Sequence, residues 1–309
     1  MSARLPVSPN PSVGAVELLS YLYEINGKAT MSGQHNQLYN MSNESAAIQA
    51  LTGKYPKVWG GEWGFSDERH DIDNIAYRPK LMSEIRRHHA MGGIVVITYH
   101  QADPRVGEPC DFDPGVIGNL TEPEWDELFD SGSKLHAVWL EHVDRLAEAF
   151  KELQAEGIPI IFRPYHEMNG GWFWWGGDAP RFLLLWKMIF DRYVGHHGLT
   201  NLLWAWNPDK PWPGVEEFYP GHDTVDLLGT DIYPGQDRDE TYPEEWYERM
   251  KGLAEGRPLA LSENSELPTA ADLERQPWAY FMGWDNLTLK ANSEDAIRAT
   301  YSASRVISI

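Results

Sequence analysis

The chain has 309 residues, of which 26 are basic and 46 acidic, so its formal net charge is −20. Nucleic acids and anionic membranes both favour Lys and Arg, and this charge argues against either as a partner. The single cysteine, Cys110, excludes an intrachain disulfide and a cysteine metal cluster, and no apolar run approaches the roughly 18 residues of a membrane-spanning helix.

Eight short apolar runs recur along the chain, and we predict that each forms a strand. In chain order they cover residues 29–33, 57–60, 93–99, 159–164, 201–206, 227–232, 258–262 and 279–284. Near-continuous apolar sequence, such as Ile94-Val95-Val96-Ile97, is typical of strands that are buried on both faces of a parallel sheet.

The segments between these runs carry helical patterns. In residues 134–153, apolar side chains recur every three or four positions, with Ser133 as a predicted N-cap and Gly157 as the residue that ends the helix. Residues 182–193 and 244–253 show similar patterns. Strands that alternate with helices predict an α/β fold with a parallel sheet.

We predict one closed (β/α)8 TIM barrel that forms a single catalytic domain over residues 1–309, with residues 1–11 as an N-terminal extension. An open doubly wound sheet is the alternative. It would be favoured by a Gly-rich phosphate loop after the first strand, but Gln34-His35-Asn36 stands there instead. The stretch 101–130 is long for a connection, so we expect an elaborated loop on the active face.

Polar and aromatic side chains follow all eight predicted strands, at the barrel end where active sites lie. They include Gln34, His35, Asn36, Glu62, Trp63, Tyr99, His100, Arg163, Tyr165, His166, Glu167, Trp206, Asn207, Asp231, Tyr233, Glu263, Asn264, Trp284 and Asp285. Any one of them is explained by a strand end that meets solvent, but convergence from eight strands indicates a site. Carboxylates, imidazoles, amides and indoles are suited to sugars. The 14 tryptophans fit both a bulky core and sugar-stacking surfaces.

Two glutamates stand where a glycosidase needs them. Cleavage of a glycosidic bond requires one carboxylic acid to protonate the leaving oxygen and a second carboxylate at the anomeric carbon. Glu167 follows the fourth predicted strand and Glu263 lies at the end of the seventh, on opposite sides of the barrel mouth. A carboxyl separation of about 5–5.5 Å would predict a retaining mechanism.

Other hydrolytic motifs are incomplete or absent. His166-Glu167 begins like the zinc motif HExxH, but Gly170 occupies the position of the second histidine. There is no G-x-S-x-G motif and no phosphate-binding P-loop.

The segment from Arg163 to Gly176, RPYHEMNGGWFWWG, closely resembles the acid/base strand of glycoside hydrolase family 26, which is best known for β-mannanases within a clan of retaining (β/α)8 glycosidases. Shorter matches follow in order: Ser32-Gly33-Gln34-His35, Thr98-Tyr99-His100, Trp204-Ala205-Trp206-Asn207, Asp231-Ile232-Tyr233-Pro234, Leu261-Ser262-Glu263 and Phe281-Met282-Gly283-Trp284. Together they extend from about residue 12 to the C-terminus.

The resemblance implies that Glu167 is the general acid/base and Glu263 the nucleophile. It also implies a role in substrate binding for His100, His166, Trp172 and Tyr233. The strand ends add Trp284 as the floor under a sugar ring, and Trp206 and Asn207 as further substrate-binding candidates. Asn264-Ser265-Glu266 departs from the family pattern after the nucleophile, which leaves Glu266 as a rival nucleophile.

Two groups are expected to tune these glutamates. Trp172 is expected to wall Glu167 and keep it protonated, whereas Tyr233 donates to Glu263. Arg163 is expected to be a buried cation beneath the barrel mouth, paired with carboxylates.

We therefore predict a retaining endo-β-1,4-mannanase that hydrolyses mannan, glucomannan or galactomannan. The alternatives are the same mechanism on mixed-linkage β-glucan or β-1,3-xylan, exo-action on mannan, and a non-catalytic carbohydrate-binding barrel. A metal-dependent hydrolase would draw ligands from His35, His100, His166 and Asp231. The favoured mechanism requires no cofactor or metal. We expect a monomer whose partner is the β-linked polysaccharide. A polymeric substrate favours secretion, and a cytoplasmic location stays open.

Overall fold

A computed structural model describes residues 4–66, 71–234 and 241–309, so residues 1–3 of the predicted extension lie outside the described part. Parallel strands form one sheet in the order β10-β1-β9-β2-β3-β4-β5-β6-β7-β8, and pairing between β8 and β9 closes it into a barrel. The strands are β1 Thr30–Met31, β2 Gly33–His35, β3 Val58–Glu62, β4 Ile94–Tyr99, β5 Ile160–Pro164, β6 Leu202–Trp206, β7 Leu227–Ile232, β8 Leu259–Asn264, β9 Tyr280–Gly283 and β10 Val306–Ile307.

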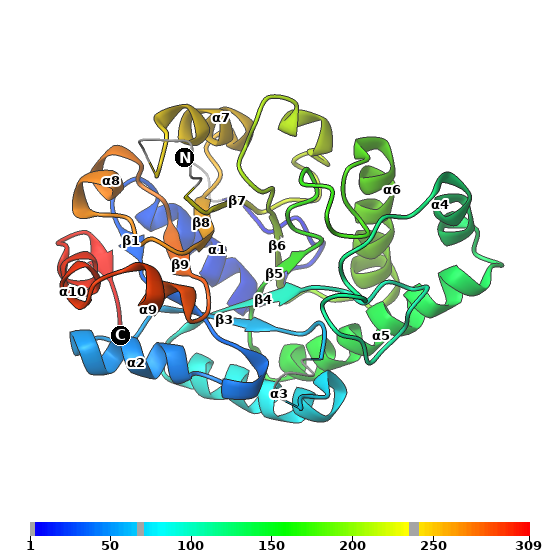
Figure 1. Cartoon of the computed structure of the whole chain (residues 1–309), viewed down its shortest axis with the longest axis horizontal. Helices are drawn as coiled ribbons and strands as arrows, with labels where there is room; N and C mark the ends of the chain where they lie inside the picture. The colour runs from blue at the N-terminus through cyan, green and yellow to red at the C-terminus, as the bar shows by residue number, and fades with distance from the viewer. Residues whose placement is uncertain (1–3, 67–70, 235–240) are drawn as a thin grey trace.

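Helices surround this barrel (Figure 1). They are α1 Val13–Ile25, α2 Asn43–Thr52, α3 Asn74–Ala90, α4 Glu122–Phe129, α5 Lys134–Ala155, α6 Ala179–Phe190, α7 Glu244–Ala254, α8 Ala270–Arg275, α9 Leu287–Ala291 and α10 Glu294–Ser302. Short turns of other helix types cover Leu38–Asn40, Asp191–His196 and Val215–Phe218. None of the helices in the described ranges is long and apolar enough to cross a membrane.

The predicted (β/α)8 barrel is confirmed, because all eight predicted strands coincide with strands of the sheet. The first prediction corresponds to β1 and β2, which flank Ser32 and both pair with β9. The clearest helix prediction is also confirmed. Helix α5 begins after Ser133, whose Oγ accepts a hydrogen bond from the His136 amide at 2.9 Å. The predicted helix over 182–193 is α6 with the wider turn that follows it.

The strands divide their side chains between two cores, because successive residues of a strand point to opposite faces. On β4, Val95, Ile97 and Tyr99 belong to the large core between sheet and helices, whereas Ile94 and Val96 face the barrel interior. This alternation decides which strand residues can reach the mouth of the barrel.

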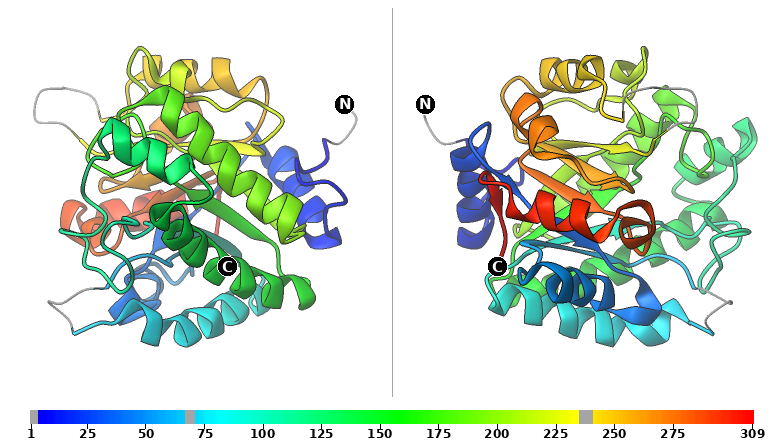
Figure 2. Two further views of the ribbon diagram at one scale, coloured as in Figure 1. Left: turned by 90° about the vertical axis from the view of Figure 1, so that its right-hand side faces the viewer. Right: turned by 60° about the vertical axis from the view of Figure 1, so that its left-hand side comes forward.

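Helix α1 closes the end of the barrel from which the strands begin. Its buried residues Leu18, Leu19 and Leu22 pack in one cluster with interior residues such as Val58 and Leu203. Figure 2 shows α1 at the opposite end of the molecule from α4. Residues 4–11 run beside this closed end, where the Val7 amide donates to Asp226 Oδ1 at 2.8 Å. Among the described residues, this end of the barrel is therefore covered, and the carboxyl ends of the strands lie at the other end.

Candidate active site

A cleft of about 680 Å3 lies at the carboxyl ends of the strands. The loops after β2, β3, β4, β5, β7 and β9, together with the end of β8, supply its walls. The lining residues are His35, Gln37, Leu38, Tyr39, Glu62, Phe65, Ser66, His100, Asp111, Phe112, Asp113, His166, Glu167, Phe173, Tyr233, Glu263, Trp284 and Asp285. The long connection predicted for 101–130 does reach this face through Asp111–Asp113, and it also contains α4.

Glu167 is held in the cleft by an unusual backbone path. The chain leaves β5 through Tyr165 and Glu167, whose φ angles of +50° and +54° are left-handed. Each such residue costs about 1–3 kcal/mol and persists where its surroundings hold it. The Tyr165 hydroxyl accepts from Trp139 Nε1 at 2.9 Å and donates to Gln101 Oε1 at 2.6 Å. The Glu167 amide donates to the Asn207 carbonyl at 2.8 Å.

The surroundings of Glu167 favour its protonated form. Burial raises the pKa of Glu167 to about 8, and the nearby carboxylates of Glu263 and Asp209 act in the same direction. Trp172, which was expected as an apolar wall, contacts Glu167 through its polar N–H group. Its Nε1 donates to Glu167 Oε2 at 2.8 Å, and this bond opposes the rise in the pKa. Glu167 is thus a carboxylic acid that can give up a proton near neutral pH.

Glu263 has a different environment at the end of β8. Its Oε1 accepts from Arg163 Nη2 at 2.6 Å, and its Oε2 accepts from the Tyr233 hydroxyl at 2.7 Å, as expected. The charge of the carboxylate is therefore compensated, and its two oxygens are held at fixed positions. His166 also approaches, with Nε2 at 3.7 Å from Glu263 Oε1.

Arg163 is the buried cation that the sequence predicted beneath the mouth. Its side chain is fully buried on β5, and the same Nη2 that binds Glu263 also donates to Asp231 Oδ2 at 2.5 Å. A register shift after Thr230 sets Asp231 opposite Glu263 on neighbouring strands. One guanidinium can therefore serve both carboxylates.

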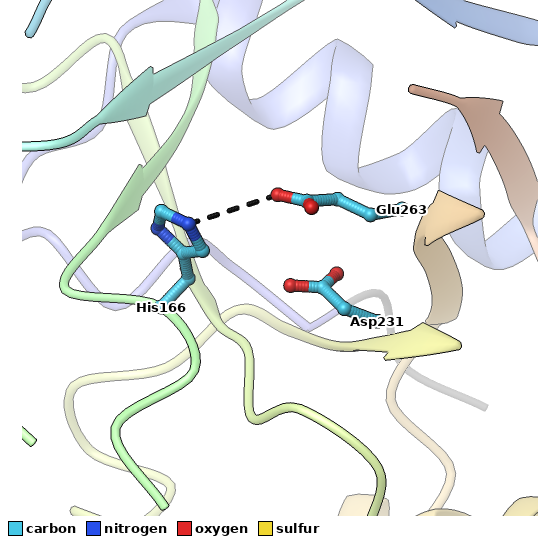
Figure 3. Close-up of side chains that lie close together, drawn as sticks. All are labelled: His166, Asp231 and Glu263. Carbon is cyan, nitrogen blue, oxygen red and sulfur yellow. Dashed lines mark ion pairs between the residues drawn. The ribbon is translucent and has the colours of Figure 1, made fainter. Parts of the chain in front are cut away.

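The histidine and carboxylates above also resemble a metal-binding group. His166 in the loop after β5, Asp231 on β7 and Glu263 on β8 converge, and their potential ligand atoms lie within 4.8 Å of one another (Figure 3). However, Asp231 Oδ2 and Glu263 Oε1 already bind the Arg163 guanidinium. A metal ion at these oxygens would lie beside a buried positive charge, so the donor set does not fit one.

The other two histidines proposed as metal ligands, His35 and His100, do not belong to this group among the described residues. His100 Nδ1 lies 2.6 Å from Glu62 Oε2, and the His35 ring stacks on Trp284 with 3.7 Å between ring centroids.

Burial lowers the pKa of His166 well below its ordinary value, and the Arg163 charge acts in the same direction. His166 is therefore a neutral imidazole suited to hydrogen bonding with hydroxyl groups.

Four of the predicted substrate-binding residues line the cleft: His100, His166, Tyr233 and Trp284. Trp172 is not among the lining residues, but its indole binds Glu167 directly. Trp206 and Asn207, also predicted to bind substrate, do not line the cleft. Trp206 has the outward parity of β6, is fully buried and donates from Nε1 to the Phe218 carbonyl at 3.0 Å. Asn207 is also fully buried, and it supports Glu167 through its backbone carbonyl.

The rival nucleophile Glu266 lies outside the cleft. Its Oε2 accepts from Thr241 Oγ1 at 3.0 Å, and it does not line the cavity. Residues that the sequence did not single out include Asp209 beside Glu167, and Phe65 and Phe112 on the cleft wall. The two phenylalanines come from irregular loops without periodic patterns, and no sequence signal marked them. Asp209 could have been found as the second residue after the strand-end Asn207.

Comparison with known proteins gives one consistent result. The family model "Glycosyl hydrolase family 26" matches residues 7–308. The structure of GH26A from a Muricauda species superposes with a TM-score of 0.89 and 35% identity, covering 97% of this chain and 98% of that one. A β-mannanase from a symbiotic protist of the termite Reticulitermes speratus, complexed with gluco-manno-oligosaccharide, gives 0.86 and 29%, covering 100% and 97%.

A curated relative, the mannan endo-1,4-beta-mannosidase of Thermothelomyces thermophilus, is 26% identical over 98% of this chain. The match spans 62% of the length of that relative.

Proposed function

Because the chain belongs to glycosyl hydrolase family 26, we propose that it is a retaining endo-β-1,4-mannanase that hydrolyses mannan, glucomannan or galactomannan. The observation that carries the proposal is the pairing of Glu167 and Glu263 in one cleft with opposite surroundings. Burial and neighbouring carboxylates favour the protonated form of Glu167, whereas Glu263 is bound by a guanidinium and a phenol hydroxyl. The first step of a double displacement requires a protonated acid at the leaving oxygen and a second carboxyl group held at the anomeric carbon.

In the first step, a carboxylate oxygen of Glu263 attacks the anomeric carbon while Glu167 gives its proton to the glycosidic oxygen. The glycosidic bond breaks, the leaving chain departs with a new hydroxyl group, and a glycosyl ester forms on Glu263. In the second step, Glu167 takes a proton from water as the water oxygen attacks the anomeric carbon. The ester bond breaks, Glu263 is again a carboxylate and Glu167 is again protonated.

The remaining cleft residues orient the sugar ring. Trp284, stacked on His35, offers an apolar face for the C–H face of the ring that is attacked. His100, fixed by Glu62, and the neutral His166 can bind ring hydroxyls. Tyr233 keeps its hydroxyl on Glu263 and so holds the nucleophile in place. These residues bind and position, and the two glutamates carry out the bond changes.

The substrate assignment rests on two observations. No Lys or Arg lies among the described residues that line the cleft, which suits an uncharged polysaccharide. The structural neighbour from the termite protist was complexed with gluco-manno-oligosaccharide. Mixed-linkage β-glucan, β-1,3-xylan and exo-action on mannan use the same two carboxyl groups, and they are the alternatives to be tested.

The deciding experiment is hydrolysis of galactomannan, glucomannan, mixed-linkage β-glucan and β-1,3-xylan, with Glu263→Ala and Glu167→Gln measured in parallel. We expect manno-oligosaccharides of several lengths from the native protein, and a loss of at least a thousandfold in both variants. Cleavage of glucan or xylan alone would show that the substrate is that polymer and not a mannan. Full activity of either variant would remove the catalytic assignment.

We also propose that the protein acts outside the cell, where polymeric mannan is found, and that it does so as a monomer with one catalytic domain. Light scattering of the purified chain and assay of culture medium against cell lysate test these two points.

A further inference from the structure

Trp212 differs from the other tryptophans of the chain in its exposure. All 14 lie in the described residues, and 11 are buried, Trp172 and Trp284 are half-buried, and Trp212 is 42% exposed. A single exposed apolar residue is ordinary on a protein surface. Trp212 is unusual because its loop is hydrogen-bonded to the loop of Glu167 and because two prolines flank it in the sequence.

The loop that carries Trp212 is joined to the loop that carries the acid/base. Asn169, two residues after Glu167, donates from Nδ2 to the Lys210 carbonyl at 3.1 Å, and its Oδ1 accepts from the Asp209 amide at 2.9 Å. The Asp209 carboxylate is close enough to raise the pKa of Glu167. Trp212 is thus three residues along the chain from Asp209, whose carboxylate raises the pKa of Glu167.

The conformation of Trp212 is restricted on both sides. It stands between Pro211 and Pro213, and a residue before proline is confined to extended backbone. Its amide donates to the Lys210 carbonyl at 2.8 Å, and Lys210 Nζ lies 5.7 Å from the centroid of its ring. An aromatic ring that is already ordered loses little entropy when a ligand stacks on it.

The loop of Trp212 adjoins the loop of Glu167 but does not line the cleft. The described residues that line the cleft come from the ends of β2, β3, β4, β5, β7, β8 and β9 or from the loops that follow them, and none of them follows β6. The sugar that is attacked occupies the cleft, because Glu263 and Trp284 are there. The general acid stands on the leaving-group side of the broken bond, so the leaving chain passes Glu167, and the loop after β6 is bonded to the loop of Glu167.

On the basis of the function proposed above, we propose that Trp212 is a stacking platform for a sugar ring of the leaving chain, on the far side of the cleavage point from the cleft. A hexopyranose offers a C–H face that packs on an indole while its hydroxyls stay in water. Such a platform binds polymer and long oligosaccharides, and it has no contact with a substrate whose leaving group is a small phenol.

The test compares Trp212→Ala, Trp212→Phe and a control, Leu184→Ala, which removes another exposed apolar side chain from α6. Each is assayed on glucomannan and on a dinitrophenyl β-mannobioside. For Trp212→Ala we expect kcat/KM on glucomannan to fall on the order of tenfold, mainly through KM, with the aryl substrate changed by less than about twofold. Trp212→Phe keeps most of the activity, and Leu184→Ala matches the native enzyme.

The cleavage pattern of an end-labelled mannohexaose gives a second readout, which a purely structural role would not move. Loss of a site for the leaving chain shifts cleavage towards the reducing end in Trp212→Ala. Unchanged kinetics and pattern would overturn the proposal, as would an equal loss on both substrates or a Phe variant as impaired as the Ala variant. If the native protein cut glucan and not mannan, the proposed substrate would be wrong, and the same comparison with β-glucan, an aryl β-cellobioside and a cello-oligosaccharide would decide the role of Trp212.

Discussion

Two neighbouring side chains shift the pKa of Glu167 in opposite directions. The Asp209 carboxylate raises the pKa of Glu167, whereas the hydrogen bond from Trp172 lowers it. In the proposed mechanism Glu167 acts while it is protonated, so we expect activity below its pKa of about 8 and a loss of activity as the pH rises through that value.

The pH profile of kcat/KM should therefore move in opposite directions in two variants. Asp209→Asn removes a negative charge, lowers the pKa of Glu167 and moves the basic limb of the profile to lower pH. Trp172→Phe removes a donor to the carboxylate and moves the same limb to higher pH. The measurement is kcat/KM on a soluble mannan from pH 5 to 10. A basic limb that moves in the same direction in both variants would contradict these electrostatic roles.

Arg163 is the residue whose loss should harm the fold most directly. Arg163→Met leaves Asp231 and Glu263 as buried carboxylates without their shared cation, and breaking a buried pair in this way costs about 3–5 kcal/mol. Chemical denaturation measures the change in the free energy of unfolding. Arg298→Met, which removes a half-exposed pair with Glu294, should change it by less than about 1 kcal/mol.

The sequence predicted which residues stand at the strand ends, but it did not predict which way each side chain points or what it contacts. Glu167, Glu263 and Tyr233 were singled out because each stands just beyond or at the end of a strand, and all three line the cleft. Trp206 and Asn207 met the same criterion, but the first points outward from β6 and the second is covered by the loop of Glu167. Which face a strand residue takes depends on the barrel register, which one sequence does not reveal.

Helix α1 shows what pattern analysis of single elements leaves out. It precedes the first strand, so it lies outside the alternation of strands and helices that predicted the barrel, and only the fold reveals that it closes the barrel end. Helices α2, α3 and α10 were not predicted individually either. The short helices α4, α8 and α9 and the strand β10 also went unpredicted, because five to eight residues, or two, carry no clear period. The eight main strands were predictable because burial on both faces leaves continuous apolar runs.

The packing of α1 against the closed end of the barrel should contribute strongly to stability. Leu22 is fully buried between the helix and the barrel interior, and Leu22→Ala should destabilise the fold by about 2–5 kcal/mol through lost burial and a remaining cavity. Val13, at the start of the same helix, is 73% exposed, and Val13→Ala should have little effect. Unfolding in urea compares the two. Similar values for both variants would mean that α1 does not seal the barrel.

The charge of the whole molecule bears on which polymers can reach the cleft. The net charge is −20, and the cleft is lined by Glu62, Asp111, Asp113, Glu167, Glu263 and Asp285 with no Lys or Arg among its described residues. The enzyme and an anionic polysaccharide would repel each other over a distance of about 10 Å at 0.1 M salt. An uncharged mannan meets no such barrier, and no electrostatic attraction brings it in.

Activity on neutral galactomannan should therefore change by less than about twofold between 20 and 500 mM NaCl, because screening has little to act on. Activity on a carboxymethylated galactomannan of the same backbone should be low at 20 mM and should rise with salt, as the repulsion is screened. Initial rates at substrate concentrations below KM measure both. A steep fall of the rate on the neutral polymer with rising salt would contradict this prediction. It would show that attraction between charges contributes to binding.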